Sequence, residues 1–400
     1  MPKNIVFCAD GTWNGPGQSD SDDPAAPWTN VFKLFLNLAG MDDPGSTQFG
    51  KEQERTLTAP DGTVRQVAKY LHGVGDSSNW LVKLIGGGLG FGLITRIVRG
   101  YTFVSRNYEP GDKIYLVGFS RGAYTARALA GLISAEGLLT SQTVDFDDQN
   151  AAYRAGTAVW YRWRHDVRQA KGDPLDAFEA AMLDLPGFLQ RPPDPATLVP
   201  AAIEAVGVWD TVGELGIPVF TNQHVDVDFF QFADRSLSPN VCYGRHAISI
   251  DEQREPFTPT LWDPDPARIV QVLFPGAHAD VGGGYPTGNA ESGLSDGALR
   301  WMIDALSGLG MAFAATPTVV PVPDPDGTAH EPWLDPLWAA LPRHSRALPA
   351  GLGLCKSVID RINAGPVVPD PTALATPYRP ANIASYLVGL AAAPATHLVC

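Results

Sequence analysis

Three residues of the chain, Ser120, Asp210 and His278, have the types and the order along the sequence that nucleophilic catalysis requires. A serine hydroxyl is a weak nucleophile, so a histidine must accept its proton as it attacks. A carboxylate on the other imidazole nitrogen fixes the tautomer and stabilises the imidazolium. The order serine, aspartate, histidine is that of α/β-hydrolase triads, whereas other serine-hydrolase folds place the three residues differently. The sequence therefore predicts a serine hydrolase with a Ser-His-Asp triad.

The segment around Ser120 predicts the turn that such a nucleophile needs. Residues 118–122 (GFSRG) fit the pattern G-x-S-x-G, after the apolar run 114–117 and before an Ala-rich segment without proline. A buried strand, a serine between glycines and a helix make a nucleophile elbow, in which larger side chains beside the strained serine would clash. The alternative is a tight turn with an incidental serine, and the flanking strand and helix favour the elbow.

The other two candidates also follow predicted buried strands, at residues 203–209 and 269–274. Because the carboxyl ends of parallel strands meet at one edge of a sheet, where ligands bind, we expect Asp210 and His278 to lie near Ser120. Asp280 is a second candidate for the carboxylate of the triad. Because it lies only two residues after His278, it is better placed to order the glycine loop that follows.

His246 is a rival for the base. It lies in the amphipathic segment 243–250, for which we predict a helix and not a strand end. We expect the remaining histidines, His330 among them, to be structural.

A predicted first strand, residues 4–9, delivers a further loop of small and polar residues to the same edge. In G-x-S-x-G hydrolases one oxyanion donor comes from such a loop and the other from the residue after the serine. The expected donors are the backbone N–H of Arg121 and that of Gly11 or Thr12. Asp10 is a secondary candidate, and a plain Asx turn is the alternative for this loop.

Composition limits the partners. The chain has 400 residues and a formal net charge of −14, with no basic block, so we expect no nucleic-acid partner and at most peripheral membrane contact. No Sec signal peptide is evident, and the longest apolar run, 84–98, contains several glycines and Arg96, too broken to span a bilayer. We expect a protein that is cytoplasmic as synthesised, with free cysteines and without a metal or cofactor motif.

Four parts of the chain differ in character. We expect residues 1–140 and 201–314 to form the two halves of one α/β core, a mainly parallel sheet with helices on both faces. Residues 141–200 predict a helical cap insertion. In it, tyrosines and tryptophans (Tyr153, Trp160, Tyr161, Trp163) alternate with arginines, and these aromatics either grip the substrate as a lid or pack on the core. Residues 315–400 predict a Pro-rich extension packed on the core.

Four sequence blocks resemble the catalytic-domain family typified by type VI secretion phospholipase effectors. They are residues 7–14 (FCADGTWN), 118–127 (GFSRGAYTAR), 207–213 (GVWDTVG) and 274–285 (FPGAHADVGGGY), and residues 378–382 (YRPAN) are similar to the usual end of that family.

The resemblance implies an α/β-hydrolase core that cleaves carboxylic esters, of lipids or phospholipids in its best-known members, through an acyl-enzyme. It also implies delivery by a signal-less secretion system and a secretion-system or immunity partner. Other interpretations stay open: a small-ester or polyester esterase of the same mechanism, a non-catalytic lipid-binding or adaptor protein, and a metal-dependent hydrolase using Asp10, His278 and Asp280.

Overall fold

The computed structural model describes residues 2–11, 27–47, 52–73, 90–171, 192–212, 235–336, 338–339 and 342–392. Thr12 and the glycine-rich stretch before Gly90 lie outside the described residues, as does part of the predicted cap insertion.

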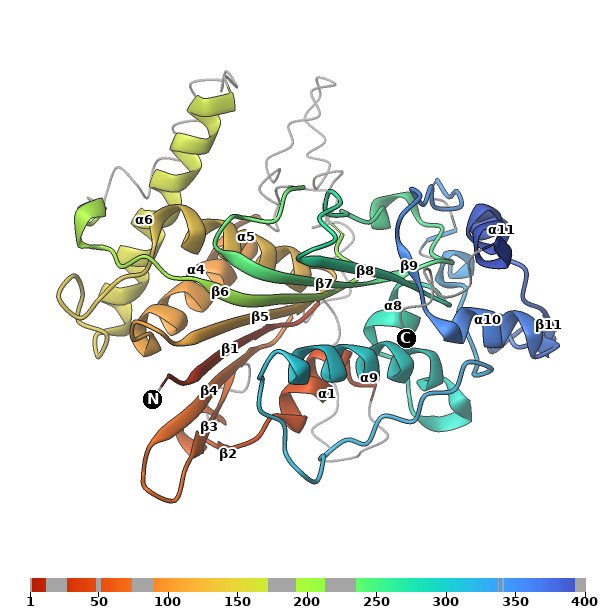
Figure 1. The fold of residues 1–400 in the computed structure, drawn as a ribbon, viewed down its shortest axis with the longest axis horizontal. Helices are drawn as coiled ribbons and strands as arrows, with labels where there is room; N and C mark the ends of the chain where they lie inside the picture. Colours follow the sequence, from red (N-terminus) through yellow and green to blue (C-terminus); the bar gives the residue numbers. More distant parts are fainter. Residues whose placement is uncertain are drawn as a thin grey trace.

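A nine-stranded, mainly parallel sheet forms the centre of the molecule (Figure 1), in the order β2-β3-β4-β1-β5-β6-β7-β8-β9. Seven neighbouring strands, from β4 to β9 in this order, pair in parallel, and β2 and β3 add antiparallel pairs at one end of the sheet. Strands β1, β5, β6 and β8 are short and largely apolar, as expected for strands buried on both faces. The parallel strands are β4 (Val64–Leu71), β1 (Asn4–Ala9), β5 (Lys113–Phe119), β6 (Ile203–Trp209), β7 (Val241–Ser249), β8 (Ile269–Phe274) and β9 (Gly353–Leu354); the antiparallel pairs involve β2 (Met41–Asp42) and β3 (Glu52–Thr58).

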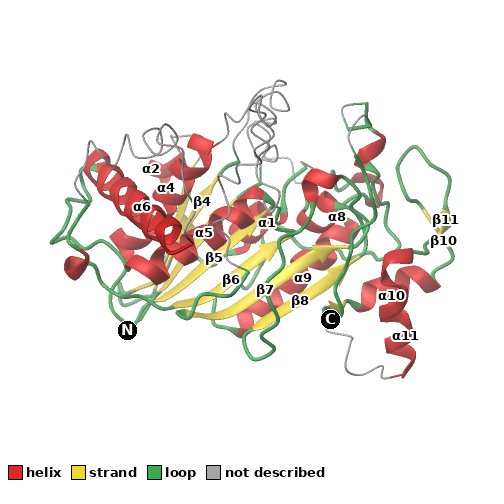
Figure 2. Cartoon of the chain, turned by 90° about the horizontal axis from the view of Figure 1, so that it is seen from above, coloured by secondary structure: helices red, strands yellow, loops and turns green. Residues whose placement is uncertain are grey.

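Helices cover both faces of the sheet, as Figures 1 and 2 show. One face carries α4 (Gly90–Asn107), α5 (Arg121–Glu136) and α6 (Gln149–Lys171); the other carries α1 (Asn30–Asn37), α8 (His278–Gly282) and α9 (Gly293–Gly308). The C-terminal part adds α10 (Lys356–Asn363), α11 (Ala384–Ala392) and the small hairpin of β10 (Pro366–Val367) and β11 (Thr376–Pro377), and α2 (Pro44–Thr47) precedes β3. The expected mainly parallel α/β fold with helices on both faces is confirmed.

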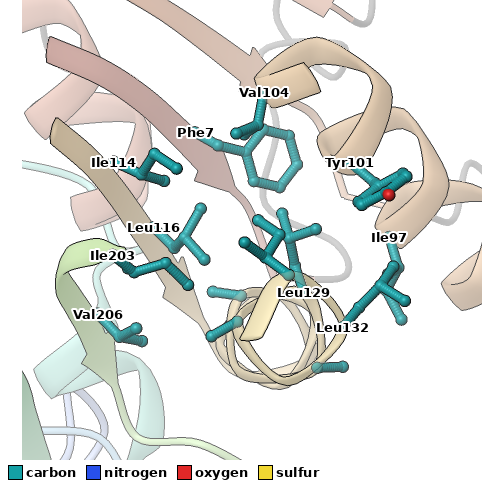
Figure 3. Packing of buried hydrophobic residues seen from close by; sticks show 14 of the residues in the cluster. Phe7, Ile97, Tyr101, Val104, Ile114, Leu116, Leu129, Leu132, Ile203 and Val206 are labelled. Carbon is teal, nitrogen blue, oxygen red and sulfur yellow. The ribbon is translucent and has the colours of Figure 1, made fainter. Parts of the chain in front are cut away.

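Side chains of successive strand residues enter two separate cores because they alternate between the faces of the sheet. Phe7 packs under α4 and α5 with Leu116 and Leu129 (Figure 3), whereas its neighbours Val6 and Cys8 pack toward α1 and α9. The two layers fix β1 and β5 at the centre, and with them the loops that follow these strands.

The aromatic residues of the predicted cap insertion belong to the first of these cores. Trp160 is 1% exposed and Trp163 is 7% exposed. The Trp163 ring lies 3.0 Å from the position that a Cβ on Gly131 would take, on the second half of α5. Of the two interpretations that the sequence leaves open, the structure shows the one in which these aromatics pack on the core.

The C-terminal extension continues the sheet with β9 and builds a third hydrophobic cluster in which Leu354, Val358 and Ile383 contact Ile248 and Leu273. Cys355 is disulfide-bonded, which corrects the expectation of free cysteines throughout, whereas Cys8 and Cys242 are free. Among the described residues no helix combines the length and the apolar character needed to cross a membrane.

Candidate active site

Ser120 lies on a strained turn between β5 and α5. Its φ is 57° and its ψ is −124°, in the left-handed half of conformational space that non-glycine residues rarely occupy. A Cβ at Gly118 would overlap the backbone of Gly122, and a Cβ at Gly122 would overlap the carbonyl oxygen of Ala9. Both glycines are therefore required for the helix to approach the sheet this closely, and the strain is of the kind that concentrates at functional sites.

Asp210 and His278 meet at the same edge of the sheet. Nδ1 of His278 lies 2.5 Å from Oδ2 of Asp210, and both side chains are almost fully buried. Asp210 also has a positive φ, 37°. His278 is the first residue of the short helix α8, whose loop begins directly after β8. Strand ends thus deliver both residues, as the sequence predicts.

The loop that carries His278 packs against the residue before the serine. The rings of Phe119 and His278 have their centroids 4.6 Å apart, and a Cβ at Gly282 would overlap the Phe119 ring. The Ser120 N–H donates to the carbonyl of Trp209, the residue before Asp210, at 3.1 Å. The loops after β5, β6 and β8 are therefore held together by direct contacts.

Nε2 of His278 is buried and has no hydrogen-bond partner among the described residues, so the Ser120 hydroxyl does not bond to it here. Catalytic hydrogen bonds are often long or absent before substrate binds and tighten afterwards. Burying an imidazole nitrogen without a hydrogen-bond partner costs free energy. We therefore expect this atom to bond with another group, such as the serine hydroxyl, when substrate is bound.

Arg346 and Ser249 also bind the Asp210 carboxylate. The guanidinium of Arg346 donates to both carboxylate oxygens, at 2.6 Å to Oδ1 and 2.9 Å to Oδ2, and the Ser249 N–H donates to Oδ1 at 3.0 Å. Burial alone would raise the pKa of Asp210, but Arg346 and the hydrogen bond from His278 outweigh it and hold the pKa well below its usual range. Asp210 is therefore ionised throughout the ordinary pH range.

Burial lowers the pKa of His278, although Asp210 and Glu252 oppose the shift. Glu252 accepts the backbone N–H of His278 at 3.2 Å and forms a buried ion pair with Arg254 at 2.7 Å. The imidazole is thus neutral near pH 7, the state in which it can accept a proton.

The sequence did not assign roles to Arg346, Glu252 and Arg254. Glu252 follows the end of β7 closely, a position that could have suggested a role at this edge of the sheet. Arg346 lies in a Pro-rich segment with no periodic pattern, and nothing in its local sequence points to the site.

Asp280 does not contact His278 through a hydrogen bond. Its carboxylate accepts the N–H of Ala277 at 2.8 Å, the N–H of His330 at 3.0 Å and a bond from Nδ1 of His330 at 2.7 Å. It therefore orders the loop around His278 and ties it to the C-terminal extension.

His246 lies in the strand β7, not in a helix, which corrects the prediction for residues 243–250. Its ring is fully buried; the N–H of Thr211 donates to Nε2 at 3.2 Å, and Nδ1 lies 3.3 Å from Oε1 of Gln271. Burial, together with the charge of Arg127, lowers the pKa of His246 to about 3. Both ring nitrogens are engaged, so this histidine is a neutral part of the core beside Asp210.

The loop after β1 reaches Ser120 at Gly11, where a Cβ would lie 3.3 Å from the Cβ of Ser120. The Gly11 N–H, however, donates to Oδ1 of Asp10 at 2.6 Å. Asp10 is buried and also accepts hydroxyl protons from Thr29 at 2.7 Å and Tyr70 at 2.6 Å. Burial raises the pKa of Asp10 to about 6 in spite of these bonds. Asp10 thus anchors the loop after β1, and its carboxylate accepts the Gly11 N–H, one of the predicted oxyanion donors.

Arg121 follows Ser120 directly and is partly buried, and its side chain makes no hydrogen bond or ion pair with any described residue. Burial, with the nearby charge of Arg96, lowers the pKa of Arg121 to about 9. The guanidinium is therefore positively charged near pH 7. The part of the chain that the structure describes contains no group of three or more His, Cys, Asp or Glu side chains able to hold a metal ion.

The parallel sheet and the strained serine turn define an α/β-hydrolase-like protein. Residues 3–305 match the family described as T6SS, phospholipase effector Tle1-like, catalytic domain. The chain belongs to this family.

Comparison with individual proteins gives more distant matches. The chain is 27% identical over 290 residues to the uncharacterized protein YEL023C of Saccharomyces cerevisiae, a match that covers 72% of this chain and 37% of the yeast protein. An uncharacterized protein from Pseudomonas aeruginosa is 18% identical, with a TM-score of 0.42, over 78% of this chain and 46% of the other. The Tle1 effector bound to the VgrG spike of the type 6 secretion system is 18% identical, with a TM-score of 0.35, over 71% of this chain and 51% of the other. The chain thus spans about half or less of the length of these relatives.

Proposed function

We propose that this protein hydrolyses carboxylic esters of lipids, phospholipids among them, with Ser120 as nucleophile, His278 as general base and Asp210 as the acid that orients it. The observation that carries the proposal is the 2.5 Å contact between Nδ1 of His278 and Asp210, together with a buried Nε2 that has no hydrogen-bond partner among the described residues. An imidazole with one nitrogen fixed by a carboxylate and the other free is arranged to accept a proton.

The reaction follows from this arrangement. Ser120 Oγ attacks the ester carbonyl carbon while Nε2 of His278 takes the hydroxyl proton, and the imidazolium is stabilised by Asp210. Collapse of the tetrahedral intermediate expels the alcohol, which receives the proton from His278, and leaves the acyl group on Ser120. A water molecule then loses a proton to His278 and attacks the acyl-enzyme, and the carboxylic acid leaves as Ser120 regains its proton.

The negative charge of the tetrahedral intermediate requires preorganised N–H donors. The backbone N–H of Arg121 is the first donor that we propose, because it opens α5 and shares the positive end of the helix dipole. The second is the N–H of Gly11 or of Thr12, and Thr12 lies outside the described residues. Gly11 would serve only if its N–H left the Asp10 carboxylate, to which it now donates.

The family supports a lipid as the ester, since its description names a phospholipase effector. Arg121 adds a chemical reason, because a phosphate group is a strong acceptor for a guanidinium. Delivery by a type VI secretion system and a partner on the secretion apparatus belong to the same proposal, and they rest on the family alone.

Labelling with a fluorophosphonate, which phosphonylates activated serines, tests the proposal. We expect the wild type to be labelled on Ser120 and to release fatty acid from phospholipid vesicles, and Ser120→Ala to lose both, with a rate loss of roughly 10⁴ to 10⁶. Ser134→Ala is the matched control, because Ser134 has a hydroxyl on the same helix and should leave both activities intact.

A folded wild type without labelling or ester hydrolysis would leave a non-catalytic lipid-binding or adaptor role. Labelling with turnover of short p-nitrophenyl or polymeric esters, but not of phospholipids, would instead favour a small-ester or polyester esterase.

A further inference from the structure

Arg346 comes from the C-terminal extension, 136 residues from Asp210 and outside the region 3–305 that matches the family. Its side chain is 4% exposed. Besides the two bonds to Asp210, its guanidinium donates to the carbonyls of Ser249 at 2.8 Å and Phe257 at 2.6 Å. Four donated bonds fix the plane of the guanidinium, and a fork of this geometry in turn fixes the plane of the carboxylate that it binds.

Oδ2 of Asp210 therefore serves two partners, Nδ1 of His278 and the Arg346 guanidinium. A carboxylate alone would stabilise the protonated form of His278 strongly, because their opposite charges attract at short range in a buried site. A second, permanent positive charge on the same carboxylate offsets part of that attraction.

We propose that Arg346 is a positioning residue of the active site: it holds the Asp210 carboxylate in the plane that orients His278 and limits the negative charge that the imidazole experiences. This inference rests on the proposed function of the three residues. It also makes the C-terminal extension a part of the catalytic unit.

Within the described part of the chain, few charged groups face His278. Asp210 contacts Nδ1, and Glu252 accepts the backbone N–H. Each of these carboxylates is paired with an arginine, Arg346 and Arg254 respectively. The remaining faces of the ring meet Phe119 and Phe257, whose centroids lie 4.6 Å and 4.9 Å away. Loss of Arg346 therefore leaves one carboxylate charge unbalanced beside the imidazole, and the pKa of His278 should rise.

The test is the pH dependence of Ser120 phosphonylation by a fluorophosphonate, measured on the whole chain. Labelling requires neutral His278, so its rate falls at low pH along an acid limb. In Arg346→Gln we expect this limb to move to higher pH by about one unit or more, the usual size of a neighbouring-charge effect. A limb at the wild-type position in folded Arg346→Gln would overturn the proposal.

Arg346→Lys gives an independent test, and it keeps the charge should the glutamine variant fail to fold. A lysine cannot bind both carboxylate oxygens in one plane. We expect labelling to slow at least tenfold at every pH, with the acid limb near its wild-type position. Labelling at the wild-type rate would overturn the positioning role.

Arg361→Gln is the matched control, because Arg361 is a buried arginine of the same extension whose guanidinium binds the backbone carbonyls of Pro325, Gly327 and Val368. It should reduce stability without moving the acid limb; a limb shifted as far as in Arg346→Gln would overturn the inference. A wild type that is not labelled on Ser120 at all would refute the proposed function, whereas a labelled wild type with unshifted variants refutes only the role of Arg346.

Discussion

His330 and Asp280 form a second buried carboxylate–histidine pair, with Nδ1 of His330 2.7 Å from Oδ1 of Asp280, on the loop that carries His278. The His330 ring also stacks on Tyr285, with centroids 3.3 Å apart and planes 8° from parallel. The C-terminal extension thus binds the loop of His278 through Asp280, whereas Asp210 binds the imidazole of His278 itself. The pair stabilises the loop and has no contact with the proposed nucleophile.

We predict that this pair makes part of the stability depend on pH. Burial lowers the pKa of His330, but the bond and charge of Asp280, with Glu291, outweigh it and raise the pKa above its ordinary value. A histidine pKa raised by folding contributes stability fully below the unfolded value of about 6.5, and the contribution is lost as the pH rises through the folded pKa.

His330→Gln should therefore lower the midpoint of thermal unfolding more at pH 6 than at pH 9, by roughly 2 °C or more, the shift that about 1 kcal/mol produces in a large domain. His246→Gln is the control, because the pKa of His246 is lowered and its removal should cost no more at pH 6 than at pH 9. An equal loss at both pH values for His330→Gln would contradict the prediction.

The assignment of acid and base gives a second prediction. Asp210→Asn and His278→Ala should each reduce kcat by at least about 10³, whereas His246→Ala should reduce it far less, provided that the variant folds. Because burial lowers the pKa of His278, the acid limb of kcat/KM for the wild type should lie below the ordinary histidine value of about 6.5. Initial rates with a p-nitrophenyl ester between pH 4.5 and 9 measure both effects. A greater loss in His246→Ala, with the fold intact, would move the base to that residue.

Arg121 gives a third prediction, on head-group preference. Arg121→Gln should lower kcat/KM for anionic phospholipids by roughly tenfold or more, since a charge-assisted hydrogen bond contributes about 1.5–3 kcal/mol. Hydrolysis of a neutral p-nitrophenyl ester should change little, because the oxyanion donor that we propose is the backbone N–H. Arg300→Gln on the exposed side of α9 is the control for net charge. Equal losses on charged and neutral esters would show that the Arg121 side chain supports the turn instead of the head group.

The sequence predicted the parts of the fold that depend on local signals. Strands at residues 4–9, 203–209 and 269–274 and the turn at Ser120 follow from apolar runs and from glycines that the backbone requires. The strand at 241–249 was missed because an amphipathic pattern over so few residues suits a helix turn as well as a strand. In the structure this segment is a strand because it pairs in parallel with β6 on one side and with β8 on the other.

Arg346 could not be predicted for a different reason. Its partner Asp210 is 136 residues away, and long-range pairings bring the extension to this edge of the sheet, among them that of β9 with β8 and that of Arg343 with Arg254. The sequence also could not show whether Arg121 has an acidic partner. Its position after Ser120 places it near the site, but the packing of other segments determines that no described acidic side chain pairs with it.

The buried tryptophans of α6 give the last prediction. In a lid that grips an acyl chain, truncating Trp160 and Trp163 would flatten the rise of kcat/KM with chain length, to which each buried methylene contributes up to ~0.8 kcal/mol. In this structure the two rings pack edge to face, with centroids 5.3 Å apart, in the core against α5.

We therefore expect Trp163→Ala to lower the free energy of unfolding by about 3–5 kcal/mol, the cost of a large core cavity, and to leave the chain-length dependence unchanged. Trp163→Phe should lose less stability and give the same substrate profile, so it separates the two effects if the alanine variant does not fold. Denaturant unfolding, beside rates for p-nitrophenyl esters from acetate to decanoate, measures both quantities. A flattened chain-length dependence at unchanged stability would restore the lid interpretation, because it would require these rings to contact the acyl chain and not the core.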